Sequence, residues 1–363
     1  MNSLTKEDVE AKLATFQDPY LQQDWLSAKA VKSITIDDKS VNISIALGYP
    51  FKEKQAEWET RLRQLLQPLV EDRQVNTYFS MQIETHVGKQ GISVLPNVKN
   101  IVAVASGKGG VGKSMVAVNL ALALAQEGAS VGILDADIYG PSQPTMLGVK
   151  EQPDFKDKQT LLPIVRHGIQ SMSMGYLVDE KTAMVWRGPM ISMAMQQLTN
   201  QTAWDALDYL IVDLPPGTGD VQLTLAQKIP VSAAVIVTTP QDLALADARR
   251  ACEMFRKLQV PILGIVENMS YYECPHCHHQ DHLFGHGGGV YLAEQYGFDF
   301  LAAIPLDVQI HEQTDGGMPP VVCAPQGEHA KLFRQLARSV AAKLSLQRKD
   351  YSGKFPKIVV KHE

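Results

Sequence analysis

Cysteine is scarce in this sequence. The 363 residues include only four cysteines, at positions 252, 274, 277 and 323. A secreted disulfide scaffold has many more cysteines for its length, so this chain does not fold around a disulfide framework. We therefore predict free thiols and a fold that depends on its hydrophobic core. Hydrophobic residues make up 45% of the sequence, which is typical of a globular protein.

Long apolar runs and an excess of basic residues are also missing. No run approaches the ~20 apolar residues that a transmembrane helix needs, and the polar opening residues 1–8 lack the apolar core of a signal peptide. The net charge is −5 and the pI is about 6.1, which argues against non-specific nucleic-acid binding. These absences predict a cytoplasmic protein with no membrane and no nucleic-acid partner.

A glycine-rich loop is the clearest motif that the sequence contains. It satisfies the phosphate-loop pattern G-x-x-x-x-G-K-[ST], and its residues are Gly107, Lys108, Gly109, Gly110, Val111, Gly112, Lys113 and Ser114. An apolar run at 101–105 predicts a strand before the loop, and an apolar run at 115–125 predicts a helix after it. Backbone N–H groups of such a loop surround phosphate oxygens at the positive end of the helix. Lys113 is expected to reach the β- and γ-phosphates, and the Ser114 hydroxyl is expected to bind Mg²⁺.

A second lysine inside the loop indicates which group of P-loop proteins the chain resembles. With Lys108, the loop resembles the deviant phosphate loop of the MinD/ParA/nitrogenase-iron-protein group of ATPases. The resemblance implies that ATP is bound, and that Lys108 contacts nucleotide across a dimer interface and takes part in catalysis with Lys113. These loops usually have Ser or Thr after the motif serine, where this chain has Met115. One charge-assisted hydrogen bond to the α-phosphate is then missing, which costs about 1.5–3 kcal/mol if water does not replace it.

The rest of the chain after residue 100 alternates between strand-like and helix-like segments. Apolar runs that predict buried strands recur at residues 131–134, 209–212, 233–237 and 262–266. Strands that alternate with helices favour an α/β fold, here a P-loop NTPase with a mostly parallel sheet covered by helices on both faces. We expect this ATPase domain to span residues 101–346, followed by a tail at 347–363.

Acidic residues follow two of the predicted strands. Asp213 comes after a strand in the Walker B arrangement and is expected to hold Mg²⁺, and Gly217 can bring its N–H close to the γ-phosphate. By resemblance to the switch aspartate of this ATPase group, Asp137 is expected to position the attacking water. Asp135 is expected to support the metal site from behind. Each aspartate alone is equally consistent with a helix cap or a turn.

Asn268 lies at the end of another predicted strand. It matches the asparagine that reads the adenine edge in these ATPases, and a side-chain amide has the donor and the acceptor that this contact needs. An ordinary turn residue at the end of a strand is the alternative.

The first part of the chain has a different pattern. Residues 1–84 combine alternating segments near 41–47 and 75–83 with one helical face near 58–69, which predicts a small α+β domain. Residues 85–100 read as a linker with two glycines and a proline. The small domain resembles the MIP18 family through Asp18-Pro19, although Tyr20 stands where that family usually has glutamate.

Two cysteines with metal-ligand spacing follow Asn268. The sequence Cys274-Pro275-His276-Cys277 places two thiols on one loop, and histidines crowd around it. A [4Fe-4S] cluster needs four thiolates, which a symmetric dimer supplies from two chains. A single-chain zinc site with two cysteines and two histidines fits the residues equally well, and a redox dithiol lacks a thioredoxin-like setting. Cys252 and Cys323 are predicted to be buried small apolar residues.

Taken together, the motifs resemble those of the Mrp/ApbC-type iron–sulfur cluster carriers. The matching segments are residues 107–114, 135–142, 186–189, 213–220, Gln241, 268–270 and Cys274 to Cys277. The resemblance implies ATP binding and slow hydrolysis, a homodimer, a labile bridging [4Fe-4S] cluster on Cys274 and Cys277, cluster scaffold partners and transfer to apo-proteins. Zinc is then the expected occupant after aerobic preparation.

Two other classes of ATPase remain as alternatives. A MinD/ParA-like spatial-organisation ATPase would have a structural zinc at the cysteine pair. An electron-transfer ATPase like the nitrogenase iron protein would have its cluster cysteines singly in two loops, one of them near Gly217, and this chain has none there. Methionines between 172 and 195 are expected in the core, with an adaptable docking surface as the alternative.

Overall fold

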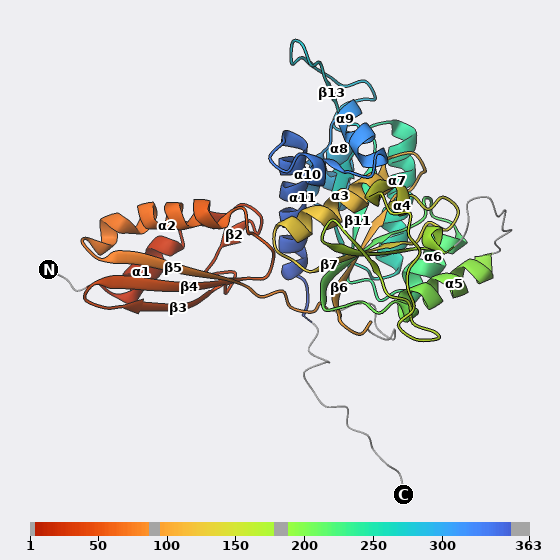
Figure 1. Cartoon of the computed structure of the whole chain (residues 1–363). Helices are drawn as coiled ribbons and strands as arrows, with labels where there is room; N and C mark the ends of the chain where they lie inside the picture. The colour runs from red at the N-terminus through yellow and green to blue at the C-terminus, as the bar shows by residue number, and fades with distance from the viewer. Residues whose placement is uncertain (1–3, 87–94, 178–187, 350–363) are drawn as a thin grey trace, which may run out of the picture.

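The structure is a computed structural model that describes residues 4–86, 95–177 and 188–349, with only the backbone described at 188–192 (Figure 1). A small unit and a larger unit lie side by side, and a hairpin projects from the larger one. Met184, Trp186 and Arg187, on which sequence expectations fall, lie outside the described residues, as does most of the tail. The described residues contain no helix that is both long enough and apolar enough to cross a bilayer.

The small unit is a three-stranded sheet with helices on it. Strand β4 pairs antiparallel with β3 and parallel with β5. Its elements are α1 (Lys6–Leu13), β1 (Gln17–Asp18), β2 (Gln23–Asp24), β3 (Val31–Ile36), β4 (Ser40–Leu47), α2 (Gln55–Val70) and β5 (Gln74–Met81). The predicted helical face is buried at Trp58, Leu62 and Leu66. The expectation of a small α+β region is confirmed.

Asp18 has a structural role in this unit. It is fully buried, and its carboxylate accepts hydrogen bonds from Tyr20 N (2.8 Å), Trp25 Nε1 (2.7 Å) and Tyr49 Oη (2.5 Å). A buried carboxylate needs such partners to remain in place. Asp18 therefore joins the turn between β1 and β2 to the aromatic core of the unit.

The larger unit is built on an eight-stranded sheet. The strand order is β15-β12-β11-β6-β10-β7-β9-β8, and every neighbouring pair is parallel except β8 with β9. The strands are β6 (Val98–Ala105), β7 (Val131–Asp135), β8 (Ile164–Arg166), β9 (Ile169–Ser173), β10 (Leu207–Asp213), β11 (Ala233–Thr238), β12 (Ile262–Glu267) and β15 (Phe300–Ala303). The strand expected from residue 101 begins at Val98, inside the segment predicted as a linker.

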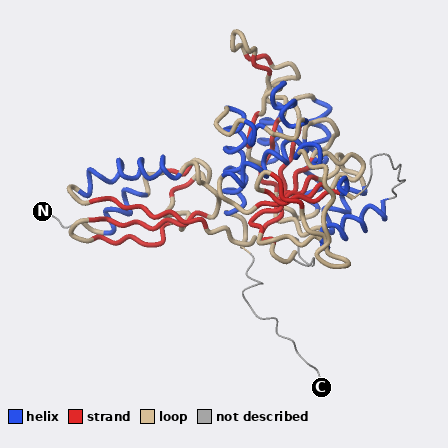
Figure 2. The backbone as a smooth tube through the Cα atoms, viewed as in Figure 1, coloured by secondary structure: helices blue, strands red, loops and turns tan. Residues whose placement is uncertain are grey.

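Helices lie on either side of this sheet (Figure 2). They are α3 (Lys113–Gln126), α4 (Gln143–Leu147), α5 (Gly188–Gln201), α6 (Asp220–Lys228), α7 (Asp242–Lys257), α8 (Gly288–Tyr296), α9 (Val308–Asp315), α10 (Pro320–Cys323) and α11 (Glu328–Ser345), with a 3-10 turn η1 (Met174–Tyr176). Helix α3 packs on α11 and on the central strands, while α7 packs on β11 and α8. The predicted α/β architecture with a mostly parallel sheet between helices is confirmed.

A buried polar cluster joins the two units. Glu53, from the small unit, pairs with Arg334 (2.9 Å) and Arg338 (2.8 Å) of α11. Arg338 Nε also donates to Tyr20 Oη (2.7 Å) and pairs with Glu127, at the end of α3. The two arginines and Glu127 are buried, and the Arg334 and Arg338 guanidiniums lower the pKa of Glu53 to about 2 against the opposing effect of burial. The units therefore contact through paired charges.

The division of the chain stays a prediction, and the cluster suggests how to test it. Residues 98–363, expressed alone, are expected to fold and bind ATP, because Arg334 and Arg338 keep Glu127 as a partner within the larger unit. Thermal unfolding should remain cooperative, with a lower midpoint than that of the full chain. An insoluble fragment, or one that melts without cooperativity, would place the boundary elsewhere.

Candidate functional site

The glycine loop connects β6 to α3, as the motif requires. A Cβ at Gly107 would lie 2.1 Å from the backbone of Asp247 in α7. Gly112 precedes the first residue of α3 with φ of +81°, and a Cβ there would lie 2.1 Å from Asn268 Nδ2. Only glycine fits these two positions, because one approaches a neighbouring backbone and the other needs a left-handed conformation. The loop is therefore fixed in shape by its surroundings.

Lys113 and Asp213 form a buried ion pair beside the loop. Asp213 ends β10 and is fully buried, and Lys113, the first residue of α3, is 5% exposed. Lys113 Nζ also lies 3.2 Å from Ser114 Oγ. The sequence prediction placed these three side chains at one site, and the fold brings them together there.

Gln143 is a site residue that sequence reasoning did not identify. It begins α4 and is buried, and its Nε2 donates to Asp213 Oδ2 (2.9 Å) and to the Ser114 carbonyl (3.1 Å). Its Oε1 is buried without a hydrogen-bond partner among the described residues. The only signal was its place directly after the acidic segment 135–142, because no motif rule specifies a glutamine there.

The residues around Lys113 fit a magnesium ion with a bound nucleotide. Magnesium prefers oxygen ligands such as hydroxyl, carboxylate, amide carbonyl and phosphate groups. Ser114 Oγ and the Asp213 carboxylate both lie beside Lys113 Nζ, and Gln143, which donates to Asp213, adds a buried amide oxygen that has no partner among the described residues. These oxygen groups fit magnesium, and the metal position stays a prediction.

Asp135 holds the segment that follows β7. Its carboxylate accepts from the backbone N–H groups of Asp137 (3.1 Å), Ser142 (3.0 Å) and Gln143 (3.0 Å), and from Ser173 Oγ (3.1 Å). Four donors on one buried carboxylate fix the turn that carries Asp137 and the start of α4. Asp135 thus has a structural role, because it holds the backbone that carries Asp137 and Gln143.

The acidic groups at this edge influence one another. Burial, and then the neighbouring Asp213 carboxylate, raise the pKa of Asp135 to about 7. Burial also raises the pKa of Asp137, while Lys113 opposes that shift. A partly buried carboxylate near a fixed cation suits the positioning of a water molecule, so the role of Asp137 stays a prediction with a plausible setting.

We expect Asp137→Asn to leave ATP binding nearly intact and to slow hydrolysis by about 10²- to 10⁴-fold, the usual contribution of a positioned acid or base. The amide keeps the size of the carboxylate and removes its charge. Single-turnover hydrolysis and nucleotide titration on the same preparation give the two quantities. If the variant loses binding together with turnover, Asp137 has a structural or metal-binding role instead.

The remaining predicted nucleotide residues surround the loop but have other contacts in this structure. Asn268 Nδ2 donates to the Val111 carbonyl (2.9 Å), and Gly217 N donates to the Ser106 carbonyl (3.0 Å). Lys108 is exposed, and Met115 packs partly buried against the core. The adenine contact of Asn268 and the phosphate contact of Gly217 stay predictions, and both residues already hold the loop region together.

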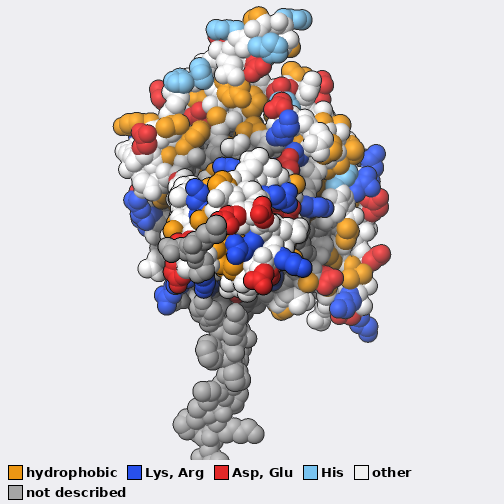
Figure 3. All heavy atoms as spheres, turned by 90° about the vertical axis from the view of Figure 1, so that its left-hand side faces the viewer, with side chains coloured by type: hydrophobic (Ala, Val, Ile, Leu, Met, Phe, Trp, Pro, Cys, Tyr) orange, Lys and Arg blue, Asp and Glu red, His pale blue; other side chains and the backbone are white. Residues whose placement is uncertain are grey.

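The cysteine pair lies on the projecting hairpin. Strands β13 (Tyr272–Glu273) and β14 (Gln280–Asp281) pair antiparallel, and the turn between them is closed by Cys274 N to the His279 carbonyl (3.0 Å). Cys274 is partly exposed and Cys277 is exposed. Histidines gather on this hairpin at the top of the molecule (Figure 3).

The turn favours the thiolate form of Cys274. The backbone N–H groups of His276 and Cys277, followed by the Cys277 thiol, lower the pKa of the Cys274 thiol. The thiolate is the form that binds metals and iron–sulfur clusters. The lowered pKa makes the Cys274 thiol easier to ionise than an ordinary thiol, and the role of the pair as ligands stays a prediction.

The other two cysteines differ from one another. Cys252 is buried on α7, as predicted, and burial raises its thiol pKa to about 12. The prediction that Cys323 is buried is wrong, because Cys323 is exposed at the end of α10. In this four-residue helix it is Val321 that is buried. The apolar residues beside Cys323 in the sequence suggested burial, but they do not place its side chain in the core.

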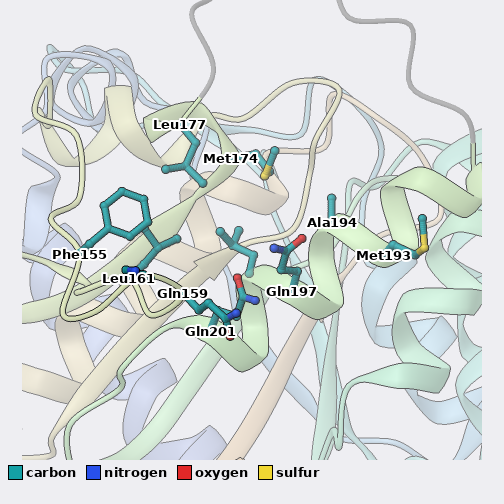
Figure 4. Close-up of a pocket in the computed structure, with 11 residues that line it drawn as sticks. Phe155, Gln159, Leu161, Met174, Leu177, Met193, Ala194, Gln197 and Gln201 are labelled. Carbon is teal, nitrogen blue, oxygen red and sulfur yellow. The ribbon is translucent and has the colours of Figure 1, made fainter.

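The methionines divide between the core and an open cavity. Met172 and Met195 are fully buried, whereas Met174 and Met193 line a cavity of about 650 Å³ between the 155–161 segment and α5 (Figure 4). Met193 is 62% exposed. None of the nucleotide-loop residues lines this cavity, so it is separate from the phosphate loop.

Two family models match separate parts of the chain. Residues 97–341 match the family described as NUBPL iron-transfer P-loop NTPase, and residues 6–77 match the family described as iron-sulfur cluster assembly protein. The sequence is 59% identical over 257 residues to the iron-sulfur cluster carrier protein of Pseudomonas fragi, covering 70% of this chain and 90% of the relative. It is 47% identical over 340 residues to the Escherichia coli protein of the same name, covering 93% and 92%.

Solved structures also resemble the larger unit. A nucleotide-binding protein from Archaeoglobus fulgidus in complex with ADP superposes with a TM-score of 0.56 at 38% identity, covering 65% of this chain and 93% of its own. The cell division ATPase MinD of Pyrococcus furiosus superposes with a TM-score of 0.52 at 22% identity, covering 66% and 98%, which supports the fold alone.

The fold and the loop define a P-loop NTPase. Within this class, the chain belongs to the NUBPL iron-transfer P-loop NTPase family. The family resemblance predicted from the motifs is thereby confirmed.

Proposed function

We propose that this chain is an ATP-hydrolysing carrier that binds a labile [4Fe-4S] cluster between two copies and transfers it to apo-proteins. The observation that carries the proposal is the accessible pair of thiols on a hairpin that projects from a nucleotide-binding unit. Similarity to named iron–sulfur cluster carriers supports it, and the ADP-bound neighbour supports nucleotide binding. Cluster scaffold proteins are the expected donors.

The ligand count favours a dimer. One chain offers Cys274 and Cys277, and a [4Fe-4S] cluster needs four thiolates. A two-fold axis through the hairpin tips would supply a pair from each copy. Both thiols lie on a hairpin that projects from the larger unit (Figure 1), which suits a contact between two copies at the hairpin tips.

The described residues give less support to a single-chain zinc site. No group of three or more histidine, cysteine, aspartate or glutamate side chains in the described part of the chain is arranged to hold a metal ion. His278 Nδ1 and His279 Nε2 lie beside the carboxylates of Glu273 (3.0 Å) and Asp281 (3.4 Å). A spatial-organisation ATPase with a structural zinc is therefore the second candidate function. None of the contacts described above favours it over the cluster carrier.

In the nucleotide reaction, the chain's residues have separable tasks. Lys113 would exchange its ion pair with Asp213 for the β- and γ-phosphates, which places a fixed cation where negative charge develops. A bound Mg²⁺ would neutralise phosphate charge from the side of Ser114 and Asp213. Asp137 would orient the attacking water, and Lys108 would reach the nucleotide of the partner copy.

Asn268 is the predicted nucleotide residue that lies nearest in sequence to the cysteine pair, six residues before Cys274. Its side chain donates to the Val111 carbonyl of the loop. A nucleotide that takes this amide as its adenine contact would break that hydrogen bond, while the backbone of Asn268 stays bonded to the Thr238 carbonyl (2.8 Å).

Anaerobic reconstitution with iron and sulfide tests the function. We expect about two iron atoms and two sulfides per chain, together with dimer formation in size-exclusion chromatography. About one zinc per chain, with no sulfide uptake and no dimer, would support the second candidate instead.

A further inference from the structure

A second cluster of metal-ligating side chains lies beyond the cysteine hairpin. His282 directly follows β14, and His286 lies just before α8. Their rings are 4.2 Å apart at 72°, and His286 Nδ1 lies 3.1 Å from His282 Nε2. Both side chains are exposed. From this geometry we propose that His282 and His286 form a binding site for a transition-metal ion of the zinc, copper, nickel or ferrous type.

The hydrogen bonds of His282 prepare one ring nitrogen for a metal. His282 Nδ1 lies 3.0 Å from the Ser270 carbonyl, which only accepts, so Nδ1 must carry the proton. Nε2 then carries the lone pair, which faces His286 Nδ1 in this structure. Histidine ligands in metal sites are usually fixed in this way, with the second ring nitrogen donating to a carbonyl or a carboxylate.

The second histidine presents its nitrogen at nearly the separation that a metal requires. Two nitrogens at 2.0–2.1 Å from a tetrahedral ion lie about 3.4 Å apart. The observed 3.1 Å is shorter by only a few tenths of an ångström. A proton on His286 Nδ1 now joins the two rings. When this proton moves to His286 Nε2, both lone pairs become available, and neutral imidazoles bind the ion without net proton release.

The backbone that carries the two rings is fixed by one buried carboxylate. Glu267, at the end of β12, accepts from Ser270 Oγ (2.6 Å) and from Gly289 N (2.5 Å). Ser270 is the residue whose carbonyl orients His282, and Gly289 lies in the first turn of α8, three residues after His286. Glu267 therefore fixes the backbone near both histidines. This reduces the conformational entropy that the two side chains lose when a metal ion binds.

The neighbouring histidines do not share this arrangement. His278 Nδ1 and His279 Nε2 each have an acidic partner, at 3.0 Å and 3.4 Å, whereas His282 and His286 face one another. The proposed site uses two protein ligands, so water or an incoming ligand would complete the coordination. Imidazole suits zinc, copper, iron and nickel, and open positions make such a site suited to exchange.

Zinc titration of the full chain tests the proposal, and the cysteine site must first be removed. The parent protein is the double variant Cys274→Ser and Cys277→Ser, in which the thiolates cannot bind, so the result does not depend on the proposed cluster function. We expect isothermal titration calorimetry with zinc chloride to show one site per chain. His282→Gln or His286→Gln in this parent should weaken binding at least tenfold.

The matched control is the double change His276→Gln and His279→Gln, which removes two other histidines of the same hairpin and should leave the affinity within about twofold. His286→Glu restores an acceptor and should recover part of the loss. Thermal melts of each variant confirm folding. The proposal is overturned if the parent binds no zinc, if His282→Gln and His286→Gln keep the parent affinity, or if the control loses as much as they do.

Discussion

Replacing Lys113 by alanine is expected to reduce ATP turnover by at least about a hundredfold, the usual cost of removing one fixed partner of the charge that develops in a transition state. Lys113 starts α3, is 5% exposed and pairs with Asp213 beside Ser114. No other lysine or arginine in the described part of the chain forms an ion pair with Asp213. Steady-state phosphate release measures the effect.

The same substitution also removes a buried cation. Asp213 would then lie beside Asp135 without a positive partner, and an uncompensated buried charge destabilises a fold by about 3–5 kcal/mol. A thermal melt is needed to separate lost stability from lost catalysis. Lys99→Ala is the matched control, because Lys99 pairs with Asp208 (2.7 Å) at the exposed beginning of the same sheet. Undiminished turnover in Lys113→Ala would show that this loop is not the catalytic phosphate site.

Most of the sheet could be predicted because its central strands are short apolar runs, each buried on both faces. β7, β10, β11 and β12 all fall on such runs. The antiparallel edge pair β8 and β9 was not predicted, since Ile164–Arg166 spans only three residues and is not fully buried. Edge strands lack the continuous apolar pattern of buried parallel strands.

The site residues could be predicted only where they belong to a short motif with fixed spacing. The phosphate loop has fixed spacing, so its residues could be named in advance. Gln143 could not, because its role comes from the tertiary placement of α4 against Asp213. The charged cluster of Glu53 with Arg334 and Arg338 was also invisible, since these residues lie about 280 positions apart in the chain. Contacts of this kind require the folded structure.

The second large effect is expected at the cysteine pair. Cys274→Ala or Cys277→Ala should each abolish cluster binding, because a bridged cluster needs both thiolates from both chains. A dimer that is held by the cluster should weaken with it. ATP hydrolysis should survive both substitutions, since the nucleotide ligands lie on β6, α3 and β10 while the thiols lie on the hairpin.

The structure improves the choice of controls. Cys323 is exposed like Cys277, so Cys323→Ala is the closest match in accessibility, and Cys252→Ala tests a buried thiol with a raised pKa. Neither control should change the iron content.

The stoichiometry separates the two metal hypotheses. A shared [4Fe-4S] cluster gives about two iron atoms per chain in the wild type and none in either hairpin variant. A zinc site gives about one metal per chain, and nearby histidines could replace one lost sulfur, so single variants would retain part of it. The measurement is iron and sulfide per chain after anaerobic reconstitution of the wild type and the four single variants. Iron at the wild-type level in both Cys274→Ala and Cys277→Ala would end the carrier proposal, because the only accessible thiols of the hairpin would then be dispensable.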